Sequence, residues 1–138
     1  KRIIESHLKM GKITVISPMG ISKMRQQHNI NADEVASAIA TSMKAEKFIV
    51  LTNVRGVLRD PHDENSLIST LTVDEIERLK ESKVVHGGMI PKVDSCVQAL
   101  KGGVHKTHII DARIQHGILL EIFTDLGVGT QIIKKCEK

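Results

Sequence analysis

The stretch NADEVASAIATSMKAEKFIVLT, residues 31–52, decides the fold because a predicted helix runs directly into a predicted buried strand. Apolar side chains recur at three- and four-residue spacing over residues 32–43, which places them on one helix face. FIVLT, residues 48–52, is a continuous apolar and β-branched run. Such runs are typical of strands in a parallel sheet that is covered on both faces. The stretch therefore predicts an α/β fold.

The residues before this stretch predict one more helix and one more strand. Ile3, Ile4 and Leu8 lie at helical spacing up to Gly11. ITVIS, residues 13–17, then predicts a short buried strand that ends at Pro18. We therefore expect helix, strand, helix and strand in succession from the amino terminus.

The residues after this stretch predict three helices and two strands. NVRGVLRDPHDENS, residues 53–66, is polar and predicts a loop with a small hairpin. Thr72 and Glu75 have the spacing of a capping box, which opens a helix to about Ser82. A further helix is predicted from near Pro91 to the glycine pair at 102–103. The remaining predictions are a strand at 106–111, a helix at 116–125, a turn at 127–130 and a strand at 131–135.

These elements predict a mostly parallel sheet of four or five strands sandwiched by helices. No linker interrupts the sequence, so we expect residues 1–138 to form a single domain. Ligands of such sheets bind outside the carboxyl ends of the strands. That rule selects SPMG at 17–20, TNVRG at 52–56 and DAR at 111–113.

Composition excludes several classes of protein. The chain has no Trp or Tyr and two Phe, which argues against a base-stacking surface for nucleic acid. It has no run of 18 apolar residues, so we expect no membrane association. Cys96 and Cys136 are too few for a disulfide framework or a four-cysteine zinc site, which favours a reducing, cytoplasmic location. The net charge of +4 weakly favours an anionic ligand such as a phosphate or a carboxylate, although ordinary surface solubility explains it better.

Asn29, Asn31 and Asp33 surround the start of the helix at 32–43. Asn31 suits the N-cap, with Glu34 at the position of a capping box. One residue is enough for a cap, so Asn29 and Asp33 are free to serve a binding site. The alternative is that Asn29 makes a turn and Asp33 complements the helix dipole.

GGMIPK, residues 87–92, places two glycines and Lys92 at the start of a helix. A lysine there opposes the helix dipole, but it suits a phosphate held by the free backbone amides. The alternative is a flexible loop with a solvated lysine. His105 and His108 point to opposite faces of a strand, so we expect no metal site and assign no role to the histidines.

Five segments resemble the carboxyl-terminal, nucleotide-binding half of the acetylglutamate kinases, a branch of the amino acid kinase family with a carbamate kinase-like fold. They are NINADEVASAIA, EKFIVLTNVRGVL, GGMIPKV, HIID and LLEIFTDLGVGT, which follow in the expected order, and the resemblance extends over essentially all 138 residues. The resemblance implies phosphoryl transfer from ATP, carried with Mg²⁺, to the side-chain carboxylate of N-acetyl-L-glutamate in arginine biosynthesis. It also implies that the amino-terminal half, with most of the acceptor pocket, lies outside these residues, which leaves this chain inactive alone.

The resemblance assigns roles residue by residue. Asp33 would orient the phosphate-binding lysines, Lys92 would neutralise the transferring phosphoryl group, and Asn29 would hold the acetylated amino acid. Glu121 and Gly127 would contact an arginine effector. The nucleotide would be bordered by Thr52, Asn53, Val54, Gly56, Val57, Met89 and Lys92. The implied partners are ATP, N-acetylglutamate, arginine, a PII-type regulator and further copies of the chain in a homo-oligomer.

Two positions depart from the family pattern, and they motivate an alternative function. Asn53 stands where the family has Asp, and Ala112 stands where the family has Gly in Asp-Gly-Arg. If that glycine needs a positive φ, Ala112 strains the turn. The alternative is a catalytically inactive kinase-like module that binds an effector such as arginine.

Overall fold

A computed structural model describes residues 1–125 and 127–134 of the chain. Its main sheet has four strands in the order β3-β5-β6-β4. β3 pairs with β5, and β4 with β6, in parallel, whereas β5 and β6 are antiparallel. The mostly parallel sheet expected from the sequence is therefore confirmed. The strands are β3 (Lys47–Thr52), β4 (Thr70–Thr72), β5 (Lys106–Asp111) and β6 (Thr130–Ile133).

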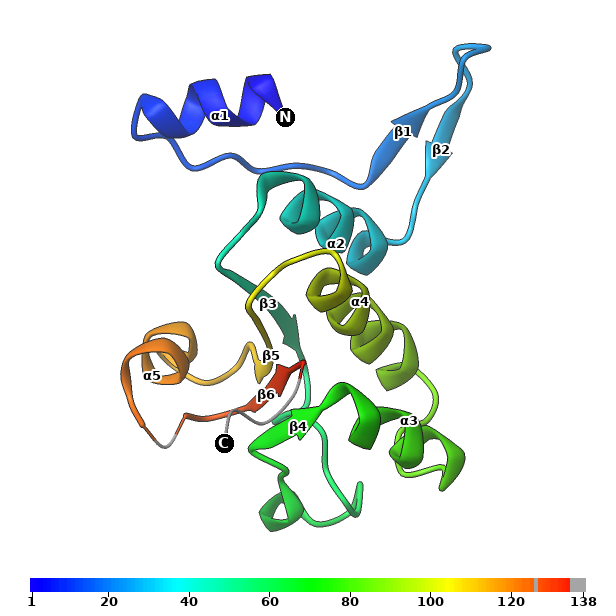
Figure 1. Ribbon diagram of the computed structural model, residues 1–138, viewed down its shortest axis with the longest axis vertical. Helices are drawn as coiled ribbons and strands as arrows, with labels where there is room; N and C mark the ends of the chain where they lie inside the picture. Colours follow the sequence, from blue (N-terminus) through cyan, green and yellow to red (C-terminus); the bar gives the residue numbers. More distant parts are fainter. Residues whose placement is uncertain (126, 135–138) are drawn as a thin grey trace.

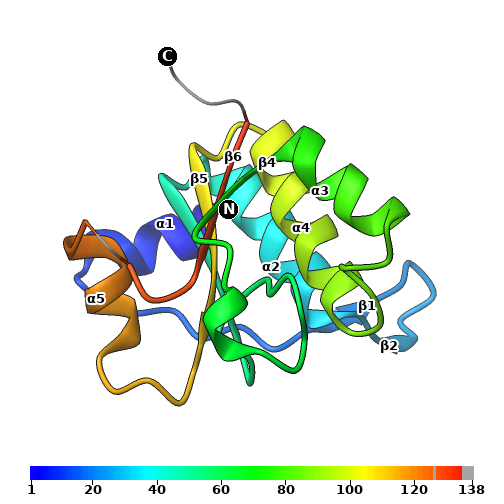
Figure 2. The same cartoon turned by 90° about the horizontal axis from the view of Figure 1, so that it is seen from below.

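Helices cover both faces of this sheet, as Figures 1 and 2 show. α2 (Ala32–Met43), α3 (Val73–Glu81) and α4 (Met89–Lys101) lie on one face, and α5 (Gly117–Phe123) lies against β5 on the other. α4 is the central helix of the core. Its buried residues are Val93, Ser95, Cys96, Val97, Ala99 and Leu100. They pack with the inward side chains of the strands, among which Ile109 and Ile132 are fully buried.

The helix starts follow the local sequence. The Asn31 side chain accepts hydrogen bonds from the backbone N–H groups of Asp33 and Glu34, so it caps α2 as predicted. Thr72 and Glu75 form both halves of the predicted capping box of α3. α4 begins at Met89, two residues before Pro91. Proline is tolerated there because the first four amides of a helix have no partner within it.

The predicted buried strand at 13–17 is wrong. The structure assigns no strand to these residues, and the side chains of Ile13 and Val15 are each 93% exposed. Thr14 and Ile16 face the apolar side of α2, so only alternate residues gain contacts. Without a neighbouring strand within the described part of the chain, the apolar run stays an extended segment. SPMG therefore does not lie at the sheet edge that was predicted for it.

Two elements near the amino terminus pack loosely on the rest. α1 (Arg2–Lys9) buries none of its residues. β1 (Met19–Ile21) and β2 (Gln27–Asn29) form an antiparallel hairpin that the sequence did not predict. Figure 1 shows α1 and the hairpin apart from the main sheet, above α2 in that view.

The remaining predictions hold with shifted bounds. The loop after β3 contains the predicted small hairpin, with an antiparallel bridge between Leu58 and Leu67 and a short 3₁₀ helix, η1 (Glu64–Ser66). The short strand β4 was missed because it has only three residues and its last one, Thr72, is also the N-cap of α3. α5 is shorter than the predicted 116–125. The last residue of the strand predicted at 131–135, Lys135, lies outside the described residues, and so does Cys136.

Candidate nucleotide site

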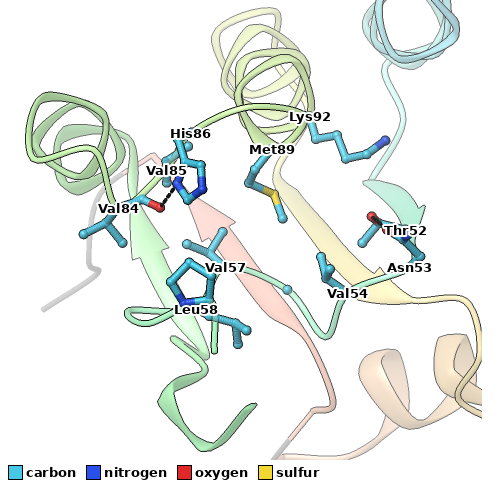
Figure 3. A pocket seen from close by; sticks show the side chains of 13 residues that line it. Thr52, Asn53, Val54, Val57, Leu58, Val84, Val85, His86, Met89 and Lys92 are labelled. Atoms are coloured by element: carbon cyan, nitrogen blue, oxygen red, sulfur yellow. Dashed lines mark hydrogen bonds between the residues drawn. The ribbon is translucent and has the colours of Figure 1, made fainter. Parts of the chain in front are cut away.

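A cleft of about 320 Å³ opens at the carboxyl end of β3, large enough for a small ligand. Three segments form it: the loop that follows β3, the connection between α3 and α4, and the start of α4. Figure 3 shows their side chains converging on one space. The location agrees with the rule that ligands of α/β sheets bind beyond the carboxyl ends of strands.

All seven residues that the sequence assigned to the nucleotide lie around this cleft. They are Thr52, Asn53, Val54, Gly56, Val57, Met89 and Lys92. The structure therefore brings residues 52–57 and 89–92 together, although more than thirty residues separate them in the chain. Their contacts with a nucleotide remain a prediction.

Gly88, one of the two glycines that the sequence analysis singled out, also lines the wall. Five further residues of the wall were missed, namely Leu58, Pro61, Val84, Val85 and His86. The carboxyl-edge rule selects loops after strands, whereas Val84, Val85 and His86 lie between two helices. The sequence did contain a signal for this wall. The apolar pair Val84-Val85 lies one residue before the glycine pair at 87–88, which is unusual for a loop in contact with water.

Asp33 and Lys92 meet beside the cleft. Nζ of Lys92 lies 3.2 Å from Oδ2 of Asp33, and their side chains are 25% and 22% exposed. Each residue extends from the amino-terminal end of its helix, Asp33 on α2 and Lys92 on α4. The two residues to which the resemblance gives roles at the phosphates therefore lie in direct contact, whereas those chemical roles stay predictions.

Two buried serines fix the packing of α2 on α4 next to that pair. Oγ of Ser37 donates a hydrogen bond to the backbone carbonyl of Ser95 at 2.9 Å, and Oγ of Ser95 donates to the carbonyl of Lys92 at 2.7 Å. Both serines are 2% exposed. Their small side chains allow close approach of the helices, which holds Asp33 and Lys92 within reach of each other.

Asn29, the predicted acceptor-binding residue, does not line the cleft. It is the last residue of β2 and is exposed, two residues before the cap of α2. Its position places it near the start of α2 rather than among the cleft residues. Its role remains a prediction.

The DAR segment at 111–113 forms a turn at the same sheet edge but lies outside the cleft. The Arg113 guanidinium donates hydrogen bonds to both carboxylate oxygens of Asp111, from Nε to Oδ1 at 2.9 Å and from Nη2 to Oδ2 at 2.7 Å. These bonds hold the pKa of the Asp111 carboxyl below its usual value. Ala112 is not among the residues with positive φ, so the expected strain at Ala112 is absent.

The predicted effector residues form part of a buried cluster. Oε1 of Glu121 lies 2.8 Å from Nδ1 of His108, and Oε2 accepts hydrogen bonds from the backbone N–H groups of Val128 and Gly129. Gly127 has φ +62°, and a Cβ there would lie 2.9 Å from Oε2 of Glu121. The sequence analysis assigned no role to His108, yet this histidine joins β5 to α5. Contact of Glu121 and Gly127 with an effector stays a prediction.

The described residues contain neither a metal-binding cluster nor a membrane-spanning helix. In residues 1–125 and 127–134, no group of three or more His, Cys, Asp or Glu side chains is arranged to hold a metal ion. In the same ranges, no helix is long and apolar enough to cross a membrane.

The fold and the cleft define a class of protein: an α/β domain with a ligand-sized cleft at the carboxyl edge of its sheet, where a lysine and a helix amino terminus converge. Residues 1–111 match the model of the amino acid kinase family. The chain belongs to the amino acid kinase family.

The chain is similar in sequence to acetylglutamate kinases of known name. The chain is 53% identical over 133 residues to the acetylglutamate kinase of Syntrophomonas wolfei, covering 96% of this chain and 46% of that protein. It is 52% identical over 132 residues to the acetylglutamate kinase of Methanobrevibacter smithii, covering 96% and 45%. The chain thus spans about half the length of the curated relatives it matches.

Two solved structures resemble the fold. N-acetylglutamate synthase from Neisseria gonorrhoeae, complexed with coenzyme A and L-arginine, matches with a TM-score of 0.89 and 31% identity, covering 98% of this chain and 31% of that one. Carbamate kinase from Giardia lamblia bound to AMP-PNP matches with a TM-score of 0.62 and 18% identity, covering 85% and 37%. The second likeness shows the fold alone.

Proposed function

We propose that the chain is the ATP-binding domain of an acetylglutamate kinase. The single observation that carries this proposal is the convergence of the loop after β3 and the start of α4, with Lys92, on one cleft. The acetylglutamate kinases of Syntrophomonas wolfei and Methanobrevibacter smithii are about half identical to the chain, which supports the same chemistry. The cleft lies in a single domain, residues 1–138, and residues outside it complete the acceptor pocket.

The reaction needs positioning and charge stabilisation more than a covalent nucleophile. A side-chain carboxylate oxygen of N-acetyl-L-glutamate attacks the γ-phosphorus of ATP, the bond to the bridging β,γ-oxygen breaks, and an acyl phosphate and ADP result. Lys92 places a positive charge beside the transferring group. Asp33 holds the Lys92 ammonium in place through their 3.2 Å contact. Asn29 binds the acetylated amino acid.

The residues present fit a Mg²⁺-bound nucleotide. Val57, Val84 and Val85 offer an apolar wall to a base, and the amides at the start of α4 with Lys92 offer positive charge to phosphates. Mg²⁺ would be carried by the ATP phosphates, where it neutralises charge that develops during transfer. Thr52, Asn53, Val54, Gly56 and Met89 complete the border.

Calorimetric titration of the chain with MgATP tests this proposal. We expect saturable binding, and we expect Lys92→Ala to weaken it at least tenfold because a charge-assisted contact with phosphate is lost. Lys101→Ala is the matched control, since Lys101 lies at the other end of α4 and should leave the affinity unchanged. Equal affinities of the unmodified chain and Lys92→Ala would refute the assignment of Lys92.

The pathway, cellular location, oligomeric state and partners of the protein form part of the same proposal. We propose that it acts in arginine biosynthesis in the cytoplasm, that it forms a homo-oligomer, and that arginine and a PII-type regulator are partners. Exposed apolar side chains support self-association, including Ile13, Val15 and Phe123. A strictly monomeric chain at high concentration in sedimentation would contradict the oligomer.

A second candidate is the inactive effector-binding module. The observation that motivates it is the likeness to N-acetylglutamate synthase complexed with L-arginine, at 31% identity over 31% of that chain, although the acetylglutamate kinases of about 50% identity favour the kinase domain. Titration with L-arginine and with MgATP separates the two functions. Arginine binding without any response to MgATP would favour the module over the kinase domain.

A further inference from the structure

His86 lies on the wall of the cleft, in the connection between α3 and α4. Its ring Nδ1 lies 3.1 Å from the backbone carbonyl oxygen of Val84. A carbonyl oxygen only accepts hydrogen bonds, so Nδ1 carries the proton of this contact. In the neutral ring the second nitrogen, Nε2, then has a free lone pair and acts as an acceptor.

The two ends of the cleft differ in chemistry, as Figure 3 shows. Lys92 lies at one end with Thr52 and Asn53. His86 lies at the other end, close to Val84 and opposite Val57. Phosphates suit the charged end, and a flat base suits the apolar end. His86 therefore supplies a polar atom where the base of a nucleotide would lie.

We infer that Nε2 of His86 accepts a hydrogen bond from the exocyclic amino group of adenine and so selects adenine over guanine nucleotides. The inference rests on the proposed function, because it names the base specificity of the same cleft. Guanine carries a carbonyl oxygen where adenine carries the amino group. That oxygen would face the Nε2 lone pair with no proton between them, which leaves two acceptors unpaired.

Binding of MgATP and MgGTP to the full chain tests the inference. Both titrations are made in the same buffer at one mildly alkaline pH. We expect the dissociation constant of MgGTP to be about tenfold larger than that of MgATP, the effect of one hydrogen bond and one rejected acceptor. The quantity that matters is the ratio of the two constants rather than either value.

Two variants of His86 and one control separate selectivity from folding. His86→Ala removes the acceptor and should bring the ratio to near one, mainly by weakening MgATP. His86→Lys replaces the acceptor by a donor, so its ratio should reverse in favour of MgGTP. His62→Ala is the control, because His62 is an exposed histidine of the neighbouring loop that does not line the cleft. It should keep the ratio of the unmodified chain.

The failures of the two proposals are distinguishable. If the unmodified chain binds neither nucleotide, the proposed function fails and the base specificity fails with it. If MgATP binds but the ratio is near one, or if His86→Ala weakens both nucleotides equally, the kinase assignment stands and the role of His86 is overturned. A His86→Lys ratio that equals that of the unmodified chain also overturns it.

Discussion

Oδ2 of Asp33 and Nζ of Lys92 lie 3.2 Å apart although fifty-nine residues separate them in the chain. Each extends from the amino-terminal end of its own helix, where the helix dipole is positive. A lone lysine at such a position would be repelled, and the Asp33 carboxylate offsets that repulsion. The pair therefore holds one defined cation at the rim of the cleft, which is the arrangement that phosphoryl transfer requires.

Asp33→Asn should impair phosphoryl transfer without unfolding the domain. Partly exposed ion pairs contribute at most about 1 kcal/mol to stability, so the free energy of unfolding in urea should change little. In the proposed complete kinase, the turnover number should fall at least tenfold because the Lys92 ammonium loses its fixed position. Glu34→Gln makes the same charge change on the neighbouring residue and should leave turnover intact. Unchanged turnover in Asp33→Asn would remove Asp33 from the mechanism.

The parts of the site that could be predicted depend on local signals. Asn31, the strand at 48–52 and the glycines before Lys92 each mark an element end through the preferences of single residues, and element ends meet at one sheet edge. The apolar run at 13–17 led to a wrong strand prediction. A strand needs a neighbouring strand to pair with, and the residues of the run do not specify one. Side-chain contacts between one element and another, such as that of His108 on β5 with Glu121 on α5, leave no periodic signal at all.

The buried contact between His108 and Glu121 should make the domain sensitive to acid. Burial lowers the pKa of His108 below its ordinary 6.5, so the unfolded chain takes up this proton at higher pH than the folded chain. Burial alone would raise the pKa of Glu121, but the hydrogen bonds from His108, Val128 and Gly129 lower it below 4.5. For both groups the unfolded chain binds the proton more readily, so stability falls as the pH falls.

The free energy of unfolding, measured in urea from pH 8 to pH 4, checks this prediction. It should be constant above the ordinary pKa of histidine and decline below about pH 6.5, with a further decline below about 4.5. Glu121→Ala should cost roughly 3 kcal/mol at neutral pH because it leaves buried partners without an acceptor. Glu81→Ala, an exposed change at the end of α3, should cost little. A flat profile between pH 7 and pH 5 would contradict the role of His108.

Gly56→Ala should disturb the loop that forms the cleft floor. A Cβ at Gly56 would lie 2.5 Å from Oγ1 of Thr130 and 2.9 Å from the Leu67 side chain. That Thr130 oxygen accepts a hydrogen bond from the buried backbone N–H of Val57 at 2.8 Å, so relief of the clash also threatens this bond. We expect a loss of roughly 1–3 kcal/mol in the free energy of unfolding.

Gly88→Ala is the comparison for Gly56→Ala. Gly88 has φ −67°, and nothing lies within 4 Å of a Cβ built on it. Its free energy of unfolding should stay within about 0.5 kcal/mol of the unmodified chain. Equal losses in the two variants would show that the contacts of Gly56 with Thr130 and Leu67 do not limit the loop.

Cys96 should be unreactive until the domain unfolds. Its side chain is fully buried in α4, and burial raises the pKa of the thiol to about 12. At pH 8 only about one thiol in ten thousand is then ionised, and reagents attack the thiolate. In a Cys136→Ser chain, labelling with a thiol reagent should be slow in buffer and complete in urea. Gln98→Cys, an exposed position on the same helix, should label at once. Rapid labelling of Cys96 in the folded chain would show that α4 opens readily, which a rigid wall for the cleft does not permit.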